Sequence, residues 1–355
     1  MRRRNYLAAA GATAFGGLAG CSGLFETRSA RSPPLVEDRP DAVYLPTHYE
    51  GMGVVGVADS EDGTYRCALT YTYPHRFWLA KPNGTTNVAI ESSDAVHLMP
   101  VVWETATGTV PPDVNPQVGV ARDGTSVAQF APWPMLSQPM GFHFGDNVGL
   151  DGEGAYTVTV SVGGTSTRRT GALADSGGNA SFAFEFSFSQ SKLEEIPYTD
   201  VPDDRQGARG AVEPAGMDML PSTQAPAVDA FPADVRDTAT SGDAAFVVAV
   251  REDATRFGGT EDQVYLAVSP RTPHNRYVLP MMSLSGTLTR GVETVFDGPL
   301  RATLDPDLRY HYGAAVPDVS EGDELALSVD VIPQVARHEG YETAFVEMPA
   351  MRVTL

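Results

Sequence analysis

Residues 155–162 read Ala-Tyr-Thr-Val-Thr-Val-Ser-Val, an alternation of apolar and polar side chains with a period of two. This alternation places one kind of side chain on each face of an extended strand. Other short runs rich in β-branched or aromatic residues, bounded by Gly, Asn, Asp or Pro, lie at 65–73, 87–92, 97–104 and 181–189. No segment keeps apolar residues at a period of 3.6, so we expect little helix. The sequence therefore predicts an all-β fold.

The strand-like runs fall into two groups. The first group occupies residues 41–190 and the second occupies residues 241–355. Residues 191–240 between them are rich in Pro, Asp, Ala and Gly, a composition typical of an irregular linker. Many short strands with frequent turn signals are typical of β-sandwiches. We therefore expect two immunoglobulin-like β-sandwich domains joined by a Pro/Asp-rich linker.

The N-terminal region predicts export and a lipid anchor. Three arginines at positions 2–4 precede a short apolar run at 7–18, which is typical of a twin-arginine signal peptide and is too short to span a membrane. The run leads into Leu-Ala-Gly-Cys, which ends at Cys21 and resembles the lipobox of exported lipoproteins. We expect residues 1–21 to be the signal peptide, with Cys21 as the lipid attachment site. Residues 22–40 would then tether the fold to the extracellular face of the cell membrane.

The composition indicates an extreme halophile. The formal net charge is −20, and lysine occurs only at Lys81 and Lys192. An acidic surface poor in lysine stays soluble in concentrated salt, where exposed charges are screened within a few Å. We expect no nucleic-acid binding, because no basic patch could replace the counterions of phosphates. The sequence shows no zinc-protease, phosphate-loop or nucleophile-elbow motif, so we also expect no enzymatic activity.

The two groups of strands resemble each other in sequence. Residues 142–148 read Phe-His-Phe-Gly-Asp-Asn-Val, and residues 310–316 read Tyr-His-Tyr-Gly-Ala-Ala-Val. An acidic turn containing Gly and an alternating strand follow in both cases. Residues 168–171 occupy the place in the first half that residues 337–340 occupy in the second. Either one unit has been duplicated, or two domains of one fold type have converged on similar strand patterns.

The first half also resembles a known family. It carries Ala-Val-Tyr-Leu-Pro at 42–46, Gly-Met-Gly at 51–53, Met135, and His-Phe-Gly-Asp-Asn-Val at 143–148. These motifs are similar to those of the periplasmic iron-transport accessory family, small immunoglobulin-like proteins that bind copper and work beside an iron permease. The resemblance covers residues 41–190. It implies a bound copper or iron ion, an iron permease as partner and, as in some relatives, a homodimer.

The resemblance implies a metal site built from histidine and methionine. Copper favours imidazole and thioether ligands, whereas iron favours imidazole with carboxylate. The methionine and the turn histidine of the family pattern fall on Met135 and His143, and the Gly-Met-Gly segment makes Met52 a candidate for an additional ligand. In the second half, His311 matches the turn histidine, and His338 stands where a later family histidine would be.

Other family ligands fall on residues that do not bind metals. An early histidine and its nearby carboxylate align with Arg66 and Ala68, and the late histidine of the first half aligns with the arginines at 168–169. An arginine side chain offers no lone pair to a metal. The methionine of the second half aligns with residues 303–304, which are Thr and Leu. Either the halves pair their remaining ligands across an interface, or the fold has been kept for another purpose.

Three further histidines are interpreted as structural. His75 and His274 each follow a proline in similar turns, where a solvated side chain is the simplest interpretation. His97 heads a strand beside Met99, where packing in the core or at a sheet edge is expected.

The leading hypothesis is a surface-anchored lipoprotein that binds iron or copper and assists metal uptake by a membrane permease. The alternative is a binding or structural β-sandwich module of the cell envelope that has lost its metal site. Retention of a metal by the purified protein separates the two hypotheses.

Overall fold

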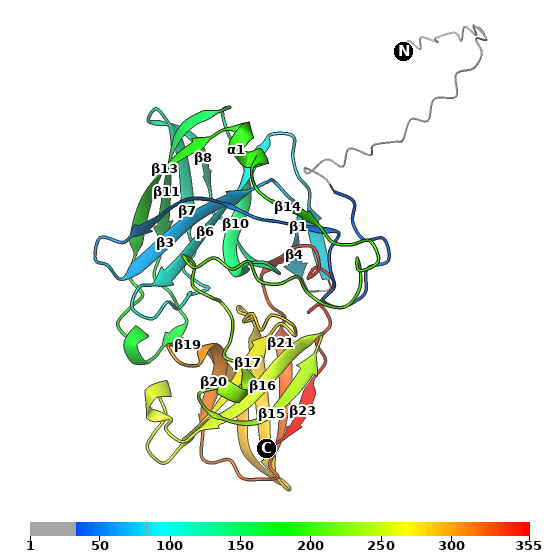
Figure 1. Ribbon diagram of the computed structural model, residues 1–355. Coiled ribbons are helices and arrows are strands. Elements are labelled where there is room, and N and C mark those ends of the chain that lie inside the picture. The colour runs from blue at the N-terminus through cyan, green and yellow to red at the C-terminus, as the bar shows by residue number, and fades with distance from the viewer. Residues whose placement is uncertain (1–32, 83) are drawn as a thin grey trace, which may run out of the picture.

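The computed structural model describes residues 33–82 and 84–355 (Figure 1). These residues form 23 strands, three short 3-10 turns and one short α-helix, α1(Gln190–Glu194). The prediction of an all-β fold is confirmed. None of the helices in this part of the chain is long and apolar enough to cross a membrane. The predicted signal peptide, with Cys21, lies outside the described residues.

The first half is a sandwich of two sheets whose inner faces share one hydrophobic core. The eight-stranded sheet has the order β2-β3-β6-β10-β9-β22-β4-β5, and the four-stranded sheet has the order β13-β11-β7-β8. The strands are β2(Gly53–Asp59), β3(Tyr65–Thr72), β4(Phe77–Lys81), β5(Gly84–Val88), β6(Asp94–Glu104), β7(Gln117–Arg122), β8(Thr125–Phe130), β9(Trp133–Ser137), β10(Gly141–Gly149), β11(Gly154–Val162), β13(Ala180–Phe188) and β22(Ala336–Arg337). A separate two-stranded sheet pairs β1(His48–Glu50) with β14(Tyr198–Asp200).

The alternating pattern of β11 explains how the two sheets pack. Tyr156, Val158, Val160 and Val162 are buried, while the residues between them are exposed. The neighbouring strand β13 alternates in the same way. Because successive side chains of a strand point to opposite faces, both strands bury one face against the eight-stranded sheet and leave the other in solvent.

The second half is built from one nine-stranded sheet, with the order β15-β16-β17-β20-β19-β18-β21-β23 and with β12 paired to β19. The strands are β12(Arg168–Arg169), β15(Asp234–Ser241), β16(Ala244–Arg251), β17(Val264–Arg271), β18(Ser283–Arg290), β19(Glu293–Asp305), β20(Arg309–Val316), β21(Glu324–Val331) and β23(Met351–Thr354). The early part of β19 pairs with β18 and its last five residues pair with β20. The sheet curls round until β15 lies beside β23. In Figure 1 this half lies below the first half.

Each half contributes a short strand to the sheet of the other half. Strand β22 comes from the second half and runs parallel to β9, with Ala336 opposite Met135. Strand β12 comes from the first half and runs parallel to β19, with Arg168 opposite Thr303. We call β12 and β22 the exchange strands. The chain after β21 rises beside β4 in Figure 1, and this path carries β22 into the first sheet.

Candidate metal centre

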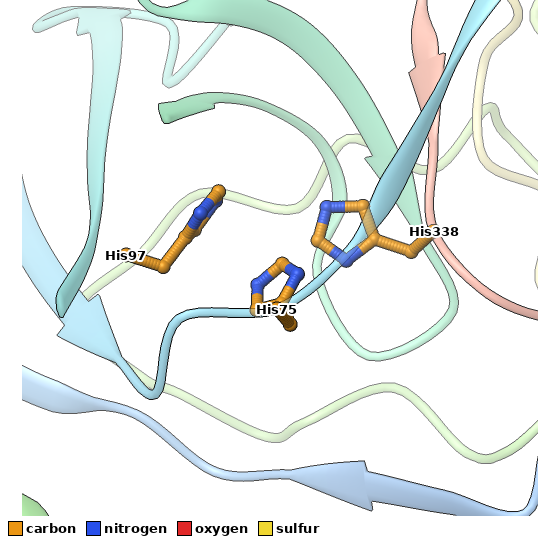
Figure 2. A group of neighbouring side chains, drawn as sticks. All are labelled: His75, His97 and His338. Atoms are coloured by element: carbon orange, nitrogen blue, oxygen red, sulfur yellow. The ribbon is translucent and has the colours of Figure 1, made fainter. Parts of the chain in front are cut away.

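Four histidines and one methionine converge where β22 enters the first sheet. The ring centroid of His75 lies 4.0 Å from that of His97 and 4.5 Å from that of His338. The ring centroid of His143 lies 5.3 Å from that of His338. The ligand nitrogens of His75, His97 and His338 lie within 4.8 Å of one another, and Figure 2 shows these three rings gathered in one place. The sulfur of Met135 is 3.3 Å from Nε2 of His338. We call these five residues the histidine–methionine centre.

Adjacent strands deliver these side chains. His143 on β10 lies opposite Met135 on β9, and Asn147 further along β10 lies opposite His97 on β6. The exchange strand β22 lies on the other side of β9, and the backbone N–H of the next residue, His338, donates to the carbonyl of Leu136 at 3.1 Å. Four neighbouring strands of one sheet thus place ligands around a common point.

A buried arginine fixes the exchange strand. The guanidinium of Arg337 is fully buried and donates to the carbonyl oxygens of Ala344 at 2.8 Å and Phe345 at 3.2 Å. These bonds pair both terminal nitrogens of the charged group inside the protein, where an unpaired charge would be costly. Since Arg337 precedes His338 directly, its anchoring also fixes the position of that histidine.

Hydrogen bonds set the tautomers of the two buried histidines of the centre. Nδ1 of His97 lies 2.9 Å from the side-chain oxygen of Asn147, and Nδ1 of His143 lies 3.0 Å from the carbonyl of Gly141. Both partners are acceptors, so each Nδ1 carries the proton and each Nε2 keeps its lone pair. Neither Nε2 atom has a hydrogen-bond partner, although both are buried. A buried polar atom without a partner costs about 1–3 kcal/mol, so two such atoms together point to a ligand.

Gly145 leaves open the space that these ligand atoms surround. A Cβ atom at this position would lie 2.5 Å from Nε2 of His97 and 3.2 Å from the sulfur of Met135. Any side chain here would therefore fill the point toward which the imidazole and the thioether are directed. The donor set and this space fit a soft or borderline transition metal ion.

The electrostatics keep the histidines in their metal-binding form. Burial lowers the pKa of His143 to about 4 and holds the pKa values of His97 and His338 well below the usual range. Burial also lowers the pKa of His75. The neighbouring histidines act in the same direction, because two imidazolium charges would repel each other. The imidazoles are neutral at neutral pH, and the neutral ring is the form that coordinates metals.

A cavity of about 90 Å³ adjoins the centre and is lined by His75 and His338. Both histidines are only half-buried, whereas His97, His143 and Met135 are buried. Thioethers and carboxylates also line the cavity, contributed by Met52, Met99, Glu50 and Glu339. The cavity therefore connects the ligands to the surroundings of the protein and gives an ion a path to them.

The structure brings together three of the five residues predicted as metal ligands. Met135, His143 and His338 lie in the centre, as the interpretation with ligands paired across the two halves requires. Met52 lines the adjoining cavity. His311 lies elsewhere, in the second half: its Nε2 lies 3.0 Å from the hydroxyl of Tyr265, and its Nδ1 lies 3.0 Å from a carbonyl oxygen. His311 is a hydrogen-bonded core histidine.

Sequence reasoning missed two residues of the centre. The interpretation of His75 as a solvated turn histidine is wrong, because its ring packs against His97 and His338. His97 is buried as expected, but its free Nε2 faces the centre. Arg66 and Ala68, which align with the early family ligands, lie on β3, and Arg66 pairs with Asp59 at 2.5 Å, whereas His97 lies on the neighbouring strand β6. A histidine two residues before Met99, inside an apolar run, was the available signal.

A domain of unknown function, DUF7350, matches residues 229–354. This range contains His338 and the exchange strand β22. No curated protein matches the chain.

Three solved structures resemble part of the chain. A copper-bound variant of FetP from uropathogenic Escherichia coli has 17% identity and a TM-score of 0.29, and the match covers 39% of this chain and 97% of that one. FetP as isolated has 16% identity, coverage of 40% and 95%, and a TM-score of 0.27. The copper-reconstituted P19 protein from Campylobacter jejuni has 16% identity, coverage of 39% and 97%, and a TM-score of 0.28. Likenesses at these scores assign no function to this chain.

Proposed function

We propose that this protein binds a transition metal ion in the histidine–methionine centre, and that the preferred ion is Cu(I). The observation that carries the proposal is the buried, unpartnered Nε2 of His97 beside the Met135 thioether, together with the second unpartnered Nε2 of His143, which lies opposite Met135 in the sheet. Neutral imidazole with thioether selects copper over harder ions. The carboxylates of Glu50 and Glu339 line the adjoining cavity, whereas the centre itself offers imidazole and thioether ligands, which favours copper over iron.

The proposed role is metal handling outside the cytoplasm. The twin-arginine pattern and the Cys21 lipobox support an exported protein held at the outer face of the cell membrane. The half-buried His75 and His338, at the wall of a cavity, support exchange of the ion with another molecule rather than permanent storage. A membrane permease for iron or copper is the partner that this placement suits.

Titration of the mature chain with Cu(I) against a chromophoric chelator tests metal binding. A Cys21→Ser substitution keeps the protein free of lipid. We expect one ion per chain, and we expect His143→Ala to remove that stoichiometric binding. The matched control is His274→Ala, which changes an exposed histidine outside the centre and should leave binding unchanged. No binding by the parent chain, or equal binding by the His143→Ala variant, would remove the proposal in favour of a metal-free envelope module.

The anchor and the partner are tested in cells. Native Cys21 should retain the protein in the membrane fraction, and Cys21→Ser should release it to the medium. Cross-linking in intact membranes should recover a polytopic permease from cells that carry the native protein. Release of both forms to the medium contradicts the anchor, and cross-linking that recovers no permease contradicts the partner.

A further inference from the structure

The second half repeats the geometry of the centre 168 positions later in the chain. His143 lies opposite Met135 where β10 pairs with β9, and His311 lies opposite Thr303 where β20 pairs with β19. Each histidine ring is held by a 3.0 Å contact between Nδ1 and the carbonyl oxygen two residues before it. The two histidines therefore have the same strand position and the same local hydrogen bond.

The residues that flank the two histidines match as well. Phe142 and Phe144 have ring centroids 5.3 Å apart and planes at 80°. Tyr310 and Tyr312, again 168 positions later, have centroids 5.5 Å apart and planes at 87°. The same edge-to-face aromatic pair therefore brackets each histidine.

The exchange strands obey the same spacing. Ala336 pairs with Met135 and Arg168 pairs with Thr303, both in parallel register. The residue that directly follows each exchange strand donates its backbone N–H to the sheet of the other half at 3.1 Å: His338 to the carbonyl of Leu136, and Thr170 to the carbonyl of Leu304. Thr170 thus occupies in the second half the position that His338 occupies in the first. The equivalence is reciprocal, since each half supplies this residue to the other.

A fourth position completes the correspondence. His97 on β6 lies opposite Asn147, and Tyr265 on β17 lies opposite Ala315, again 168 positions apart. A Cβ atom added at Gly313 would clash with the Tyr265 hydroxyl, as a Cβ atom added at Gly145 would clash with the Nε2 of His97. The side-chain ends of His97 and Tyr265 therefore occupy equivalent points.

We infer that the chain contains two copies of one unit, and that the second copy holds a latent counterpart of the metal centre. Four of the five positions of the centre have a counterpart in these pairings, of which His311 is retained and three have changed. The changed positions are Tyr265 for His97, Thr303 for Met135 and Thr170 for His338.

Tyr265 closes the latent site. Its hydroxyl lies 3.0 Å from Nε2 of His311 and uses the lone pair that the equivalent His143 leaves free. The ring of Tyr265 stacks on Phe257 at a centroid distance of 3.9 Å and a plane angle of 8°. Thr170 donates to Asp305 at 2.5 Å, and Asp305 also pairs with Arg256 at 2.7 Å. Hydrogen bonds and an ion pair thus satisfy the groups that a metal would satisfy in the first half.

The inference predicts that two substitutions reopen the site. Tyr265→His supplies an imidazole and frees Nε2 of His311, while Thr303→Met supplies a thioether opposite His311. The added methionine volume is offset by the smaller ring at position 265. Both changes are made in the His143→Ala chain, so that any bound Cu(I) reports on the second half.

The expected result is one Cu(I) per chain, and His311→Ala added to this variant should abolish it. The matched control pairs Tyr265→Phe with Thr303→Met; it frees the His311 nitrogen without a second imidazole and should give no stoichiometric binding. A variant that melts cooperatively as its parent does but binds no Cu(I), or whose binding survives His311→Ala, overturns the inference.

A reciprocal variant keeps the inference testable if the reopened site does not fold. His97→Tyr with Met135→Thr installs the closing residues of the second half in the first. The new hydroxyl should reach Nε2 of His143 and offset the loss of the bond between His97 and Asn147, so the chain should fold with a melting temperature within about 10 °C of the parent and bind no Cu(I). A melting temperature lower by more than about 10 °C would contradict the equivalence. These folding measurements do not depend on whether the native chain binds copper.

Discussion

Asn147 holds two ligands of the histidine–methionine centre without touching the space for the ion. Its side-chain oxygen lies 2.9 Å from Nδ1 of His97 and accepts the backbone N–H of His75 at 3.3 Å. Its side-chain nitrogen donates to the carbonyl of His75 at 2.9 Å. Because one amide fixes the tautomer of one imidazole and the backbone of the other, Asn147→Ala should loosen both.

The magnitude follows from these three bonds. Each contributes about 0.5–1.5 kcal/mol to folding, so Asn147→Ala should lower the free energy of unfolding of the apo chain by about 1.5–4.5 kcal/mol. Loss of a residue that orients a metal ligand typically costs about 10–100-fold in metal affinity. This range corresponds to about 1.4–2.7 kcal/mol of binding free energy.

The assay is Cu(I) competition titration on the parent, Asn147→Ala and Asn147→Asp chains, with folding checked by urea denaturation. Asn147→Asp keeps an acceptor for His97 and for the His75 N–H but cannot donate to the His75 carbonyl. We expect it to recover most of the affinity that the alanine variant loses. Asn87→Ala, at an exposed position on the edge strand β5, is the matched control.

The reasoning is refuted if folded Asn147→Ala binds Cu(I) within twofold of the parent. It is equally refuted if Asn87→Ala loses as much affinity as Asn147→Ala. Either result would mean that the orientation of His97 and His75 does not determine the Cu(I) affinity of the centre.

Three further predictions concern the same chain. Gly145→Ala should preserve the fold but abolish stoichiometric Cu(I) binding, because the new methyl group would lie 2.5 Å from the His97 nitrogen; titration and a thermal melt check both parts. Met135→Leu, which keeps the volume and removes the sulfur, should weaken Cu(I) binding more than Zn(II) binding, as parallel titrations with both ions would show. The apo chain should lose stability as pH falls. The pKa of His311 is lowered to about 4 in the fold from an ordinary value of 6.5, so its contribution is fully present above pH 6.5 and is lost between pH 6.5 and 4. That contribution is about 3 kcal/mol. Because the histidines of the centre also lose stability in this range, it is measured by urea denaturation as the part of the loss between pH 7 and pH 4 that His311→Ala removes; a loss of the same size in both chains contradicts the prediction.

Much of the fold could be predicted because strand signals are local. The alternation of Tyr156, Val158 and Val160 can be read from a few consecutive residues, and the structure buries that set of side chains. Met135 and His143 were also accessible, because they sit eight residues apart on neighbouring strands of one hairpin.

The rest of the centre depends on contacts that no local pattern contains. His338 joins the centre through a parallel pairing between β22 and β9, which lie about 200 residues apart in the chain. His97 and Arg66 both occur in apolar strand segments, and only the pairing of β6 with β10 shows which of them faces the ligands. His75 follows a strand in a turn whose burial is determined by the other half.

The exchange strand β22 determines how early in the synthesis of the chain the centre can form. The N-terminal sheet has a gap between β9 and β4 until β22 arrives, and β22 begins at Ala336. A nascent chain must therefore be synthesised past this point before its first half can be completed, so folding is delayed by a contact of very long sequence separation. Copper in the cytoplasm would meet an unfinished site throughout translation, and a chain that stalls before Ala336 would leave the ribosome without its last ligand.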